Sequence, residues 1–311
     1  MVSGSLPSAG FHVAVTGASG LIGKALVRRL TNMEYRVRPV VRRTARPGEI
    51  SWNPENGTLD PTDLEGLDAV VHLAGENIGA RWTARRKERI RSSRLLGTRL
   101  LSDTLAGLKN PPAVLIAGSA IGIYGNRGDE ILTEESPPGE PSHDFLARLG
   151  QEWEGAADAA RAAQVRVVHP RFGLVLSPRG GVLARMLLPF RLGLGGRLGN
   201  GSQWMSWVSI DDAVDALIHL LTANSLSGPV NVTAPNPIRN RDFTRTLGRV
   251  LARPTLFSVP SPALRLAFGE MADATLLSST RVMPRRLLAS GFHFKSPDLE
   301  GALRHVLQEE R

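Results

Sequence analysis

Three glycines at regular spacing carry the clearest chemical signal in this sequence. VAVTGASGLIGKAL places Gly17, Gly20 and Gly23 between an apolar strand-like run and a helix-like run. A residue without a Cβ permits a tight turn, a close approach of the backbone to a ligand and close packing of helix on strand. The N–H groups at the start of the helix can then bind a phosphate. The pattern predicts a dinucleotide site, with a plain glycine-rich turn as the alternative.

The end of the next expected strand indicates which dinucleotide binds. An NAD site carries an Asp or Glu about 20 residues beyond the glycines, where it accepts from the ribose hydroxyls. This chain has VVRRTARP there, with Arg42 and Arg43 in place of the acid. A carboxylate would repel a 2′-phosphate, whereas guanidinium groups bind it through charge-assisted hydrogen bonds. We therefore expect NADP(H) as the cofactor, with two incidental surface arginines as the alternative.

These residues need a scaffold of parallel strands, and the first half of the chain has the matching pattern. Strands are expected at 11–17, 35–42, 68–75, 113–120 and 165–176, and helices at 21–32, 83–108 and 143–163. Strands that are almost continuously apolar and separated by helices form a parallel sheet covered on both faces. The expected fold class is α/β, a Rossmann-type doubly wound parallel sheet with its ligand over the carboxyl ends of the strands.

The second half of the chain predicts a smaller lobe that closes over the sheet. The stretch 177–203 is rich in Gly and Arg, 204–222 returns to a strand and a helix capped near Ser209 or Asp211, and the rest holds short elements and many prolines. We assign residues 1–10 to a flexible tail and 11–176, with 204–222, to an NADP-binding Rossmann domain. Residues 177–203 and 223–311 are assigned to a smaller substrate-binding lobe.

Composition narrows the class of protein. Apolar residues make up 42% and charged residues 22% of the 311 residues, and no run approaches the ~18 apolar residues of a membrane span. The absence of cysteine excludes disulfides and thiol catalysis and fits a cytoplasmic protein. Much of the net charge of +9 lies in 81–99, where eight Arg and Lys face one Glu. This charge suits a solvated helix face or a phosphorylated ligand, and we expect no nucleic-acid or membrane partner.

Several motifs occur in the order typical of extended short-chain dehydrogenases/reductases, the broad group that includes the NAD-dependent sugar epimerases and dehydratases. They are TGASGLIG (16–23), DAVVHLAG (68–75), GSA (118–120) and WVSIDD (207–212). More narrowly, the chain resembles the epimerase family proteins, sometimes labelled cell-division-inhibitor-like. That resemblance rests on LAGENIGARW (73–82), SRLLGT (93–98), LLPFRLGLGGRLGNGSQWMSW (187–207) and RVMPRRLLASGFHF (281–294), and it runs over nearly the whole chain from residue 11.

The resemblance implies a cofactor site residue by residue. The pyrophosphate would follow the glycine turn, the two arginines would bind the 2′-phosphate, and the end of the 68–75 strand would pass beside the middle of the cofactor. The implied set is Gly17, Ser19, Gly20, Leu21, Ile22, Gly23, Arg42, Arg43, Leu73, Ala74, Gly75, Arg94 and Val175, the last bordering the nicotinamide end. For Arg94 a solvated helix charge is the alternative.

The reaction of extended relatives needs a proton donor that is missing from its usual place here. Those enzymes use a serine to orient the substrate, a tyrosine as general acid or base, and a lysine that lowers the tyrosine pKa from about 10. Ser119 is in place, but the helix HDFLARLGQEWE (143–154) offers only Phe145 with Leu149, or Asp144 with Arg148. Neither pair can do the work of the tyrosine, because Phe has no proton to exchange and Arg does not release one.

Tyr124 lies five residues after Ser119 and is the candidate replacement for the missing acid, with loop packing as the alternative. Two functions therefore remain open. The first is an NADP(H)-dependent oxidoreductase or epimerase-like enzyme acting on a hydroxyl or carbonyl of a small substrate, nucleotide-linked or free. The second is a catalytically weak or inactive NADP(H)-binding regulatory protein. The presence of Ser119 favours the first.

Loops that should face the cleft between the lobes carry groups able to stack on a ring or hydrogen-bond hydroxyls. The candidate substrate residues are Trp82, Gln203, Trp204 and Trp207, with packing between the lobes as the alternative role. His143, His169 and His219 show no metal-ligand spacing, and no metal site is predicted.

Overall fold

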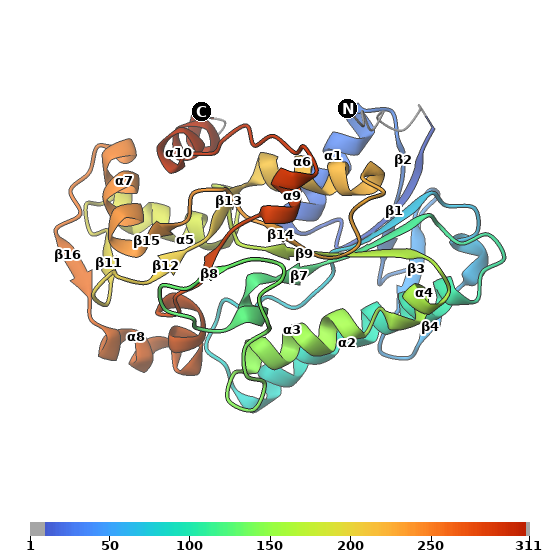
Figure 1. Ribbon diagram of the computed structural model, residues 1–311, viewed down its shortest axis with the longest axis horizontal. Helices are drawn as coiled ribbons and strands as arrows, with labels where there is room; N and C mark the ends of the chain where they lie inside the picture. The colour runs from blue at the N-terminus through green and yellow to red at the C-terminus, as the bar shows by residue number, and fades with distance from the viewer. Residues whose placement is uncertain (1–9, 309–311) are drawn as a thin grey trace.

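The computed structural model describes residues 10–308, and the largest element within them is a nine-stranded sheet (Figure 1). Its strands, in spatial order, are β14 (Gly228–Val232), β9 (Arg166–Phe172), β6 (Val114–Ala117), β5 (Ala69–His72), β1 (His12–Thr16), β2 (Arg36–Val41), β3 (Ile50–Asn53) and β4 (Thr58–Leu59). The short β7 (Ser119–Ala120) also pairs with β9. Every pairing in this sheet is parallel except that of β3 with β4.

Helices cover both faces of the sheet, because alternate residues of each strand point to opposite sides. Val13 and Val15 of β1 join a core with α1 (Leu21–Asn32) and α6 (Ile210–Thr222), whereas Ala14 joins a second core with α2 (Ala84–Ala106). Two further helices, α3 (Phe145–Gly155) and α4 (Asp158–Ala162), lie beside α2 (Figure 1). The doubly wound α/β fold predicted from the sequence is confirmed.

The strand order reverses at β1, and this reversal positions the site. The chain runs from β1 through β2 to β3, and then returns to β5 on the other side of β1. The register pairs Thr16 with Val40 of β2 and with His72 of β5. The turns that follow these three strands therefore lie together at the carboxyl edge of the sheet, where doubly wound proteins bind their ligands.

Helix ends follow local signals in most places. The first turn of α2 is capped by Thr83, whose side-chain oxygen accepts from a backbone N–H at 3.2 Å. The cap of α6 is Ser209 rather than Asp211. The region 143–163, expected as one helix, is interrupted after Gly155 and forms α3 and α4. Of the tail expected over 1–10, all but the last residue lies outside the described range.

The smaller lobe lies to the left of the large sheet in Figure 1. Its elements include α5 (Gly181–Arg191), β11 (Gly196–Leu198), β12 (Trp204–Met205), β15 (Ile238–Arg239), α7 (Asn240–Leu251), β16 (Phe257–Val259), α8 (Ser261–Phe268), β17 (Arg281–Val282) and α10 (Leu299–Gln308). β10 (Leu174–Leu176) and β13 (Trp207–Ser209) form a separate parallel pair. β14 falls within the stretch assigned to this lobe, yet it pairs with β9 and extends the large sheet.

Candidate functional site

The turn between β1 and α1 has no room for side chains at two of its glycines. Gly17 has a φ of +66°, and a Cβ there would lie 2.7 Å from the carbonyl carbon of Leu73 at the end of β5. A Cβ on Gly23 would lie 2.1 Å from the carbonyl oxygen of Gly17. The turn is therefore packed between β5 and α1 so tightly that only glycine fits at these two positions.

The N-terminus of α1 has the features of an anion site. Its first turn contains no acidic residue, and its N-cap Gly20 has no side chain to accept from the free N–H groups. Ser19 and Gly20 are exposed, while Leu21 and Ile22 are half-buried. The first N–H groups of a helix have no partner within it, and the helix dipole adds a partial positive charge. A cofactor pyrophosphate fits this cradle.

A buried threonine locks the neighbouring turn after β5. Thr16 Oγ1 accepts from the backbone N–H groups of Leu73 at 3.1 Å and Ala74 at 3.2 Å, and lies 2.7 Å from Nδ1 of His72. Since its oxygen accepts both N–H groups, its own proton points to Nδ1, which must be unprotonated. Burial lowers the pKa of His72 to about 3, so the ring is neutral. The turns after β1 and β5 are thus held together by a neutral network.

The two arginines predicted to bind a 2′-phosphate differ in their surroundings. Arg43 forms a bidentate pair with Glu49, with N···O distances of 2.7 and 2.6 Å. The hydrogen bond from Arg43 lowers the pKa of Glu49, which keeps this carboxylate charged. Arg42 is exposed, and among residues 10–308 it has no hydrogen-bond or ion-pair partner. Arg42 is therefore the arginine free to bind an anion, and Arg43 is engaged by its neighbour.

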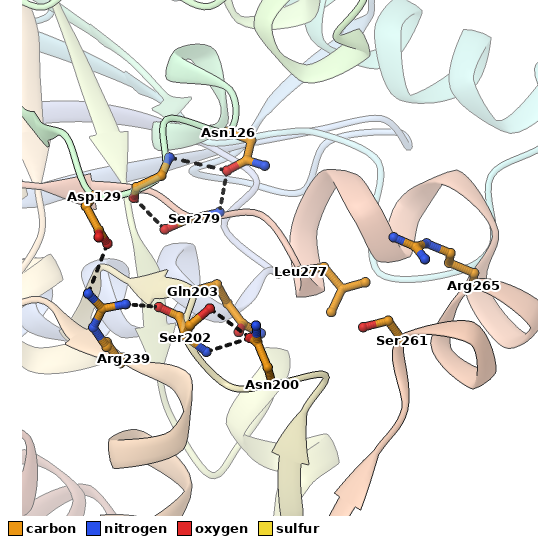
Figure 2. A pocket seen from close by; sticks show the side chains of 11 residues that line it. Asn126, Asp129, Asn200, Ser202, Gln203, Arg239, Ser261, Arg265, Leu277 and Ser279 are labelled. Carbon is orange, nitrogen blue, oxygen red and sulfur yellow. Dashed lines mark hydrogen bonds and ion pairs between the residues drawn. The ribbon is translucent and has the colours of Figure 1, made fainter.

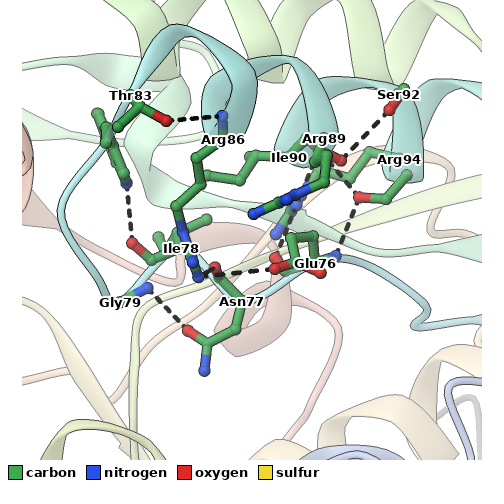
Figure 3. A network of polar contacts seen from close by, with 12 residues as sticks. Glu76, Asn77, Ile78, Gly79, Thr83, Arg86, Arg89, Ile90, Ser92 and Arg94 are labelled. Carbon is green, nitrogen blue, oxygen red and sulfur yellow. Dashed lines mark hydrogen bonds and ion pairs between the residues drawn. The ribbon is translucent and has the colours of Figure 1, made fainter.

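Arg94 of α2 fastens the loop that follows β5. Its Nη1 donates to the carbonyl oxygens of Glu76 at 3.0 Å and Ile90 at 3.1 Å, and its Cζ lies 5.0 Å from the ring centroid of Trp153. Figure 3 shows this arginine among the contacts that tie the loop to the first half of α2. A Cβ on Gly75 would lie 3.2 Å from the guanidinium carbon. Burial lowers the pKa of Arg94 to about 10, and the group still carries its charge at neutral pH.

Val175 lies on the side of the site opposite β2. It sits in β10, which pairs with β13, and its side chain is half-buried against the core. The loop after β10 approaches α1, since a Cβ on Gly180 would lie 3.3 Å from Cδ1 of Leu21. The end of β10 and the start of α1 are therefore neighbours. The contacts of the predicted residues with a cofactor stay predictions.

Ser119 and Tyr124 belong to a buried polar chain. Ser119 Oγ donates to Glu154 at 2.7 Å, and Arg171 donates to both oxygens of the same carboxylate at 2.7 and 2.8 Å. Arg171 also donates to the Tyr124 hydroxyl at 2.8 Å, which in turn donates to Asn231 at 2.8 Å. Burial alone would raise the pKa of Glu154, but the hydrogen bond and charge of Arg171 lower it overall. The chain therefore holds an ionised carboxylate between a hydroxyl and a guanidinium.

The position of Tyr124 is incompatible with its expected role as the acid. The side chain has no exposed surface, and its hydroxyl is committed to Arg171 and Asn231. Burial raises its pKa, which makes it a poorer proton donor. A general acid must come within hydrogen-bond reach of the substrate, and this tyrosine faces only protein. The alternative of loop packing is correct for Tyr124.

The helix without the tyrosine and lysine uses the corresponding positions for structure. Asp144 caps α3 by accepting from the N–H groups of Leu146 at 2.8 Å and Ala147 at 3.1 Å. Phe145 is buried, and Arg148 is exposed to solvent. None of these side chains reaches Ser119 by any contact within residues 10–308. α3 therefore supplies Glu154 to the site and no exchangeable proton of its own.

Two of the predicted substrate residues are structural. Trp82 is 7% exposed, packs with its ring centroid 5.2 Å from that of Phe145, and donates its indole N–H to the carbonyl oxygen of Ile78. Trp207 is fully buried in the main core and donates to the carbonyl oxygen of Asn236. Neither ring is among the residues that line the cleft described below, and the burial of both supports packing, the alternative role given for them.

A cleft of about 590 Å³ lies where the loop 126–129 meets the smaller lobe, and one of the other two predicted substrate residues is at this cleft (Figure 2). Gln203 lines this cleft directly. Trp204 is not among the residues that line it, but donates its indole N–H to the lining residue Asp129 at 2.7 Å. The guanidinium groups of Arg239 and Arg281 lie 4.7 and 4.3 Å from its ring centroid, so the ring is already stacked. Trp204 therefore acts on the cleft through Asp129 and Arg239.

Comparison with known proteins gives the chain its family. The sequence model of the NAD dependent epimerase/dehydratase family matches residues 13–233, and that of a domain of unknown function, DUF1731, matches residues 259–306. The epimerase family protein Mb2239 of Mycobacterium bovis is 45% identical over 293 residues, which cover 94% of this chain and 96% of the relative. The chain belongs to the NAD dependent epimerase/dehydratase family.

Two solved structures of relatives match this family member along its whole length. The crystal structure of the human epimerase family protein SDR39U1, with NADPH, is 35% identical and gives a TM-score of 0.87, covering 96% of this chain and 99% of that one. A Corynebacterium glutamicum structure described as a nucleoside-diphosphate sugar epimerase is 36% identical with a TM-score of 0.79, covering 96% of this chain and 58% of that one. The resemblance stated from the motifs is confirmed.

Sequence reasoning missed the partners of the site in this family member. Glu154 and Arg171 form a buried ion pair next to Ser119, with side-chain exposures of 14% and 6%. The signal was available in Glu154 of the 143–154 helix and in Arg171, the second arginine of an otherwise apolar strand, since such charges are buried only when paired. Within residues 10–308 no group of three or more His, Asp or Glu could hold a metal ion. In the same range, no helix is long and apolar enough to cross a membrane.

Proposed function

We propose that the protein binds NADPH along the carboxyl edge of its large sheet and slowly reduces a carbonyl group of a small substrate held at the smaller lobe. The observation that carries the cofactor choice is Arg42, an exposed arginine without a partner in the described structure. It lies two positions beyond Val40, which pairs with Thr16 of β1 beside the glycine turn. The NADPH in the human relative's structure supports the same cofactor.

Each part of the dinucleotide has a matching group in this chain. The free N–H groups at the start of α1 would hold the pyrophosphate, and Arg42 would bind the 2′-phosphate through a charge-assisted hydrogen bond. Gly75 would let the middle of the cofactor approach the loop, with the charged Arg94 beneath it. Bound NADPH would supply a hydride to the substrate.

The proton that accompanies the hydride would come from water, which makes the reaction slow. Ser119 donates to an ionised carboxylate and is only 3% exposed, so its proton is directed away from a substrate. Its oxygen accepts no hydrogen bond in the described structure, so both lone pairs are left to accept one from water or from a substrate hydroxyl at the reaction face, the side of the site beside Ser119. General acid help is worth ~10²–10⁴ in rate, and the absence of a tyrosine and lysine removes that factor. The lack of cysteine further supports a cytoplasmic setting.

A second candidate function is an NADPH-binding regulatory protein without turnover. The burial of Tyr124 and the purely structural use of α3 favour it, because together they leave the reaction face without a general acid. The two candidates share the cofactor site and differ only in chemistry. Measured turnover therefore decides between them.

The test combines calorimetric titration of NADPH with NADPH oxidation on a panel of aldehydes and ketones. We expect firm NADPH binding and slow, saturable turnover. Ser119→Ala should lower the turnover rate without altering NADPH affinity. Ser225→Ala, an exposed serine with no side-chain contact in the described structure, is the matched control. Firm binding with no turnover on the whole panel would leave the regulatory function, and absence of NADPH binding would overturn both.

A further inference from the structure

The cleft of the smaller lobe is connected to the reaction face through the chain itself. The loop that carries Asn126 and Asp129 follows Ser119 after one short 3₁₀ turn, η2 (Ile121–Tyr124). On the other side, a Cβ on Gly173 at the end of β9 would lie 2.6 Å from the carbonyl oxygen of Ser206, just after β12. The loop that follows Ser119 and the segment that follows β9 therefore both lead to residues at or beside this cleft.

The charges of the cleft are already neutralised. Arg239 donates to the carboxylate of Asp129 at 3.0 Å and to the carbonyl oxygen of Ser202 at 2.6 Å. Arg265 pairs with Asp273 at 3.0 Å. The hydrogen bond from the Trp204 indole, together with Arg239, lowers the pKa of Asp129 and keeps it ionised. Among the residues that line the cleft, all of them within the described range, no arginine lacks a carboxylate partner.

Arg281 is a further cation near the cleft, and it is not among the residues that line it. Its guanidinium lies over the Trp204 ring. A diphosphate placed in the cleft would thus meet an exposed carboxylate and two cations that are already paired. Removing those cations from their partners would leave charges unpaired. The cleft is poorly suited to a nucleoside diphosphate.

The uncommitted polar atoms suit hydroxyl groups instead. Asn126 and Asn200 use their side-chain oxygens as acceptors for neighbouring groups, and their amide nitrogens have no partner in the described structure (Figure 2). Gln203 keeps its oxygen free, since only its nitrogen is bonded. Ser261 and the second oxygen of Asp129 complete a mixed set of donors and acceptors. Hydroxyls both donate and accept, so adjacent hydroxyls match such a set.

We propose that this cleft binds an uncharged polyhydroxylated group, as in a sugar or polyol, and that it does not take a nucleoside diphosphate. Leu277 gives the cleft one apolar wall for the C–H face of such a group. The volume of about 590 Å³ falls in the usual range for small-ligand sites. The role of this group as part of a substrate rests on the proposed reductase function, whereas its binding to the cleft does not.

The test measures the binding of methyl α-D-glucopyranoside and of UDP to the full chain. Binding is detected by saturation-transfer NMR, with and without NADPH. We expect the glycoside to give a saturable signal and UDP to give none at the same concentrations. Asn200→Asp keeps the acceptor oxygen of its turn and removes the amide donor, and should weaken the glycoside about fivefold, the loss of one net hydrogen bond. Asn224→Asp, at an exposed asparagine elsewhere, should change nothing.

A second variant removes a negative charge from the cleft and tests whether UDP then binds. Asp129→Asn leaves Arg239 without its carboxylate, so UDP should gain a measurable signal in this variant. Binding of UDP to the wild type in preference to the glycoside would overturn the proposal, as would unchanged glycoside affinity in Asn200→Asp. NADPH titrated into the same samples separates the two ideas: glycoside binding without NADPH binding refutes only the reductase function.

Discussion

Replacing Tyr124 with phenylalanine tests whether this tyrosine supports the fold rather than the reaction. The change removes two hydrogen bonds of 2.8 Å each and leaves the Asn231 oxygen without a donor in a site with no solvent access. Arg171 keeps its pair with Glu154, and the ring that lies 5.0 Å from it is retained. Leaving a buried polar group unsatisfied costs ~1–3 kcal/mol.

That loss is measurable as a shift in the unfolding midpoint. With an unfolding entropy of roughly 2 cal/mol/K per residue, a loss of ~2 kcal/mol in a chain of 311 residues lowers Tm by about 3 °C. Tyr35→Phe is the matched control, because the Tyr35 hydroxyl is also buried but has no hydrogen-bond partner among the described residues. The control should leave Tm unchanged or raise it slightly.

The same two variants are then compared for chemistry. NADPH affinity by calorimetry and the rate of NADPH oxidation should be the same in Tyr124→Phe as in the wild type, within about twofold. A general acid contributes at least ~10²-fold in most enzymes. A tenfold or larger loss of turnover with an unchanged Tm would therefore refute the structural assignment of Tyr124 and restore it as the acid.

Two further changes test the site from other directions. Gly20→Val places a branched side chain at the anion cradle, where Gly20 is exposed, and should abolish NADPH binding in calorimetry with circular dichroism unchanged; normal binding would reduce the glycines to a structural turn. His72 has a folded pKa of about 3 against 6.5 unfolded, so below pH 6.5 the unfolded state binds the extra proton and stability falls by ~1.4 kcal/mol per pH unit until about pH 3. In urea unfolding from pH 7 to 4, His72→Asn, which keeps an acceptor for Thr16, should lose this part of the slope and keep the part due to His169 and His219, whose pKa values burial also lowers; an equal slope in both proteins would show that His72 is not a titrating group.

The large sheet and the glycine turn were predictable because their signals are local. Apolar strands and helices alternate in the sequence, and this alternation indicates a doubly wound parallel sheet. The tight turn at Gly17 and Gly23 follows from the packing of the first helix on that sheet. β14 was assigned to the smaller lobe because a five-residue strand that begins with Gly228 and Pro229 carries no mark of its sheet. Only pairing with β9, far away in the sequence, assigns it.

The details of the site were less predictable because they depend on distant partners. Residue type identified Arg42 and Arg43 as candidates. The ion pair that engages Arg43 forms only because the chain folds back and brings Glu49 beside it. Tryptophan occurs both in substrate sites and in protein cores, so the residue type of Trp82 and Trp207 does not assign their role. Their burial in the folded chain favours the core role. The sequence placed Tyr124 near Ser119, but the buried network of these two residues joins five elements that no spacing brings together.

The central claim is that the unpaired Arg42 makes this an NADPH site. Calorimetric titration of NADPH and NADH into the wild type, Arg42→Ala and Arg28→Ala tests it most directly, since Arg28 is an exposed arginine of α1 with no partner in the described structure. One charge-assisted contact is worth ~1.5–3 kcal/mol, so Arg42→Ala should weaken NADPH by roughly ten- to a hundredfold and leave NADH unchanged. Arg28→Ala should bind both like the wild type. Equal affinity of the wild type for the two cofactors, or an Arg42→Ala variant that still prefers NADPH, would contradict the account.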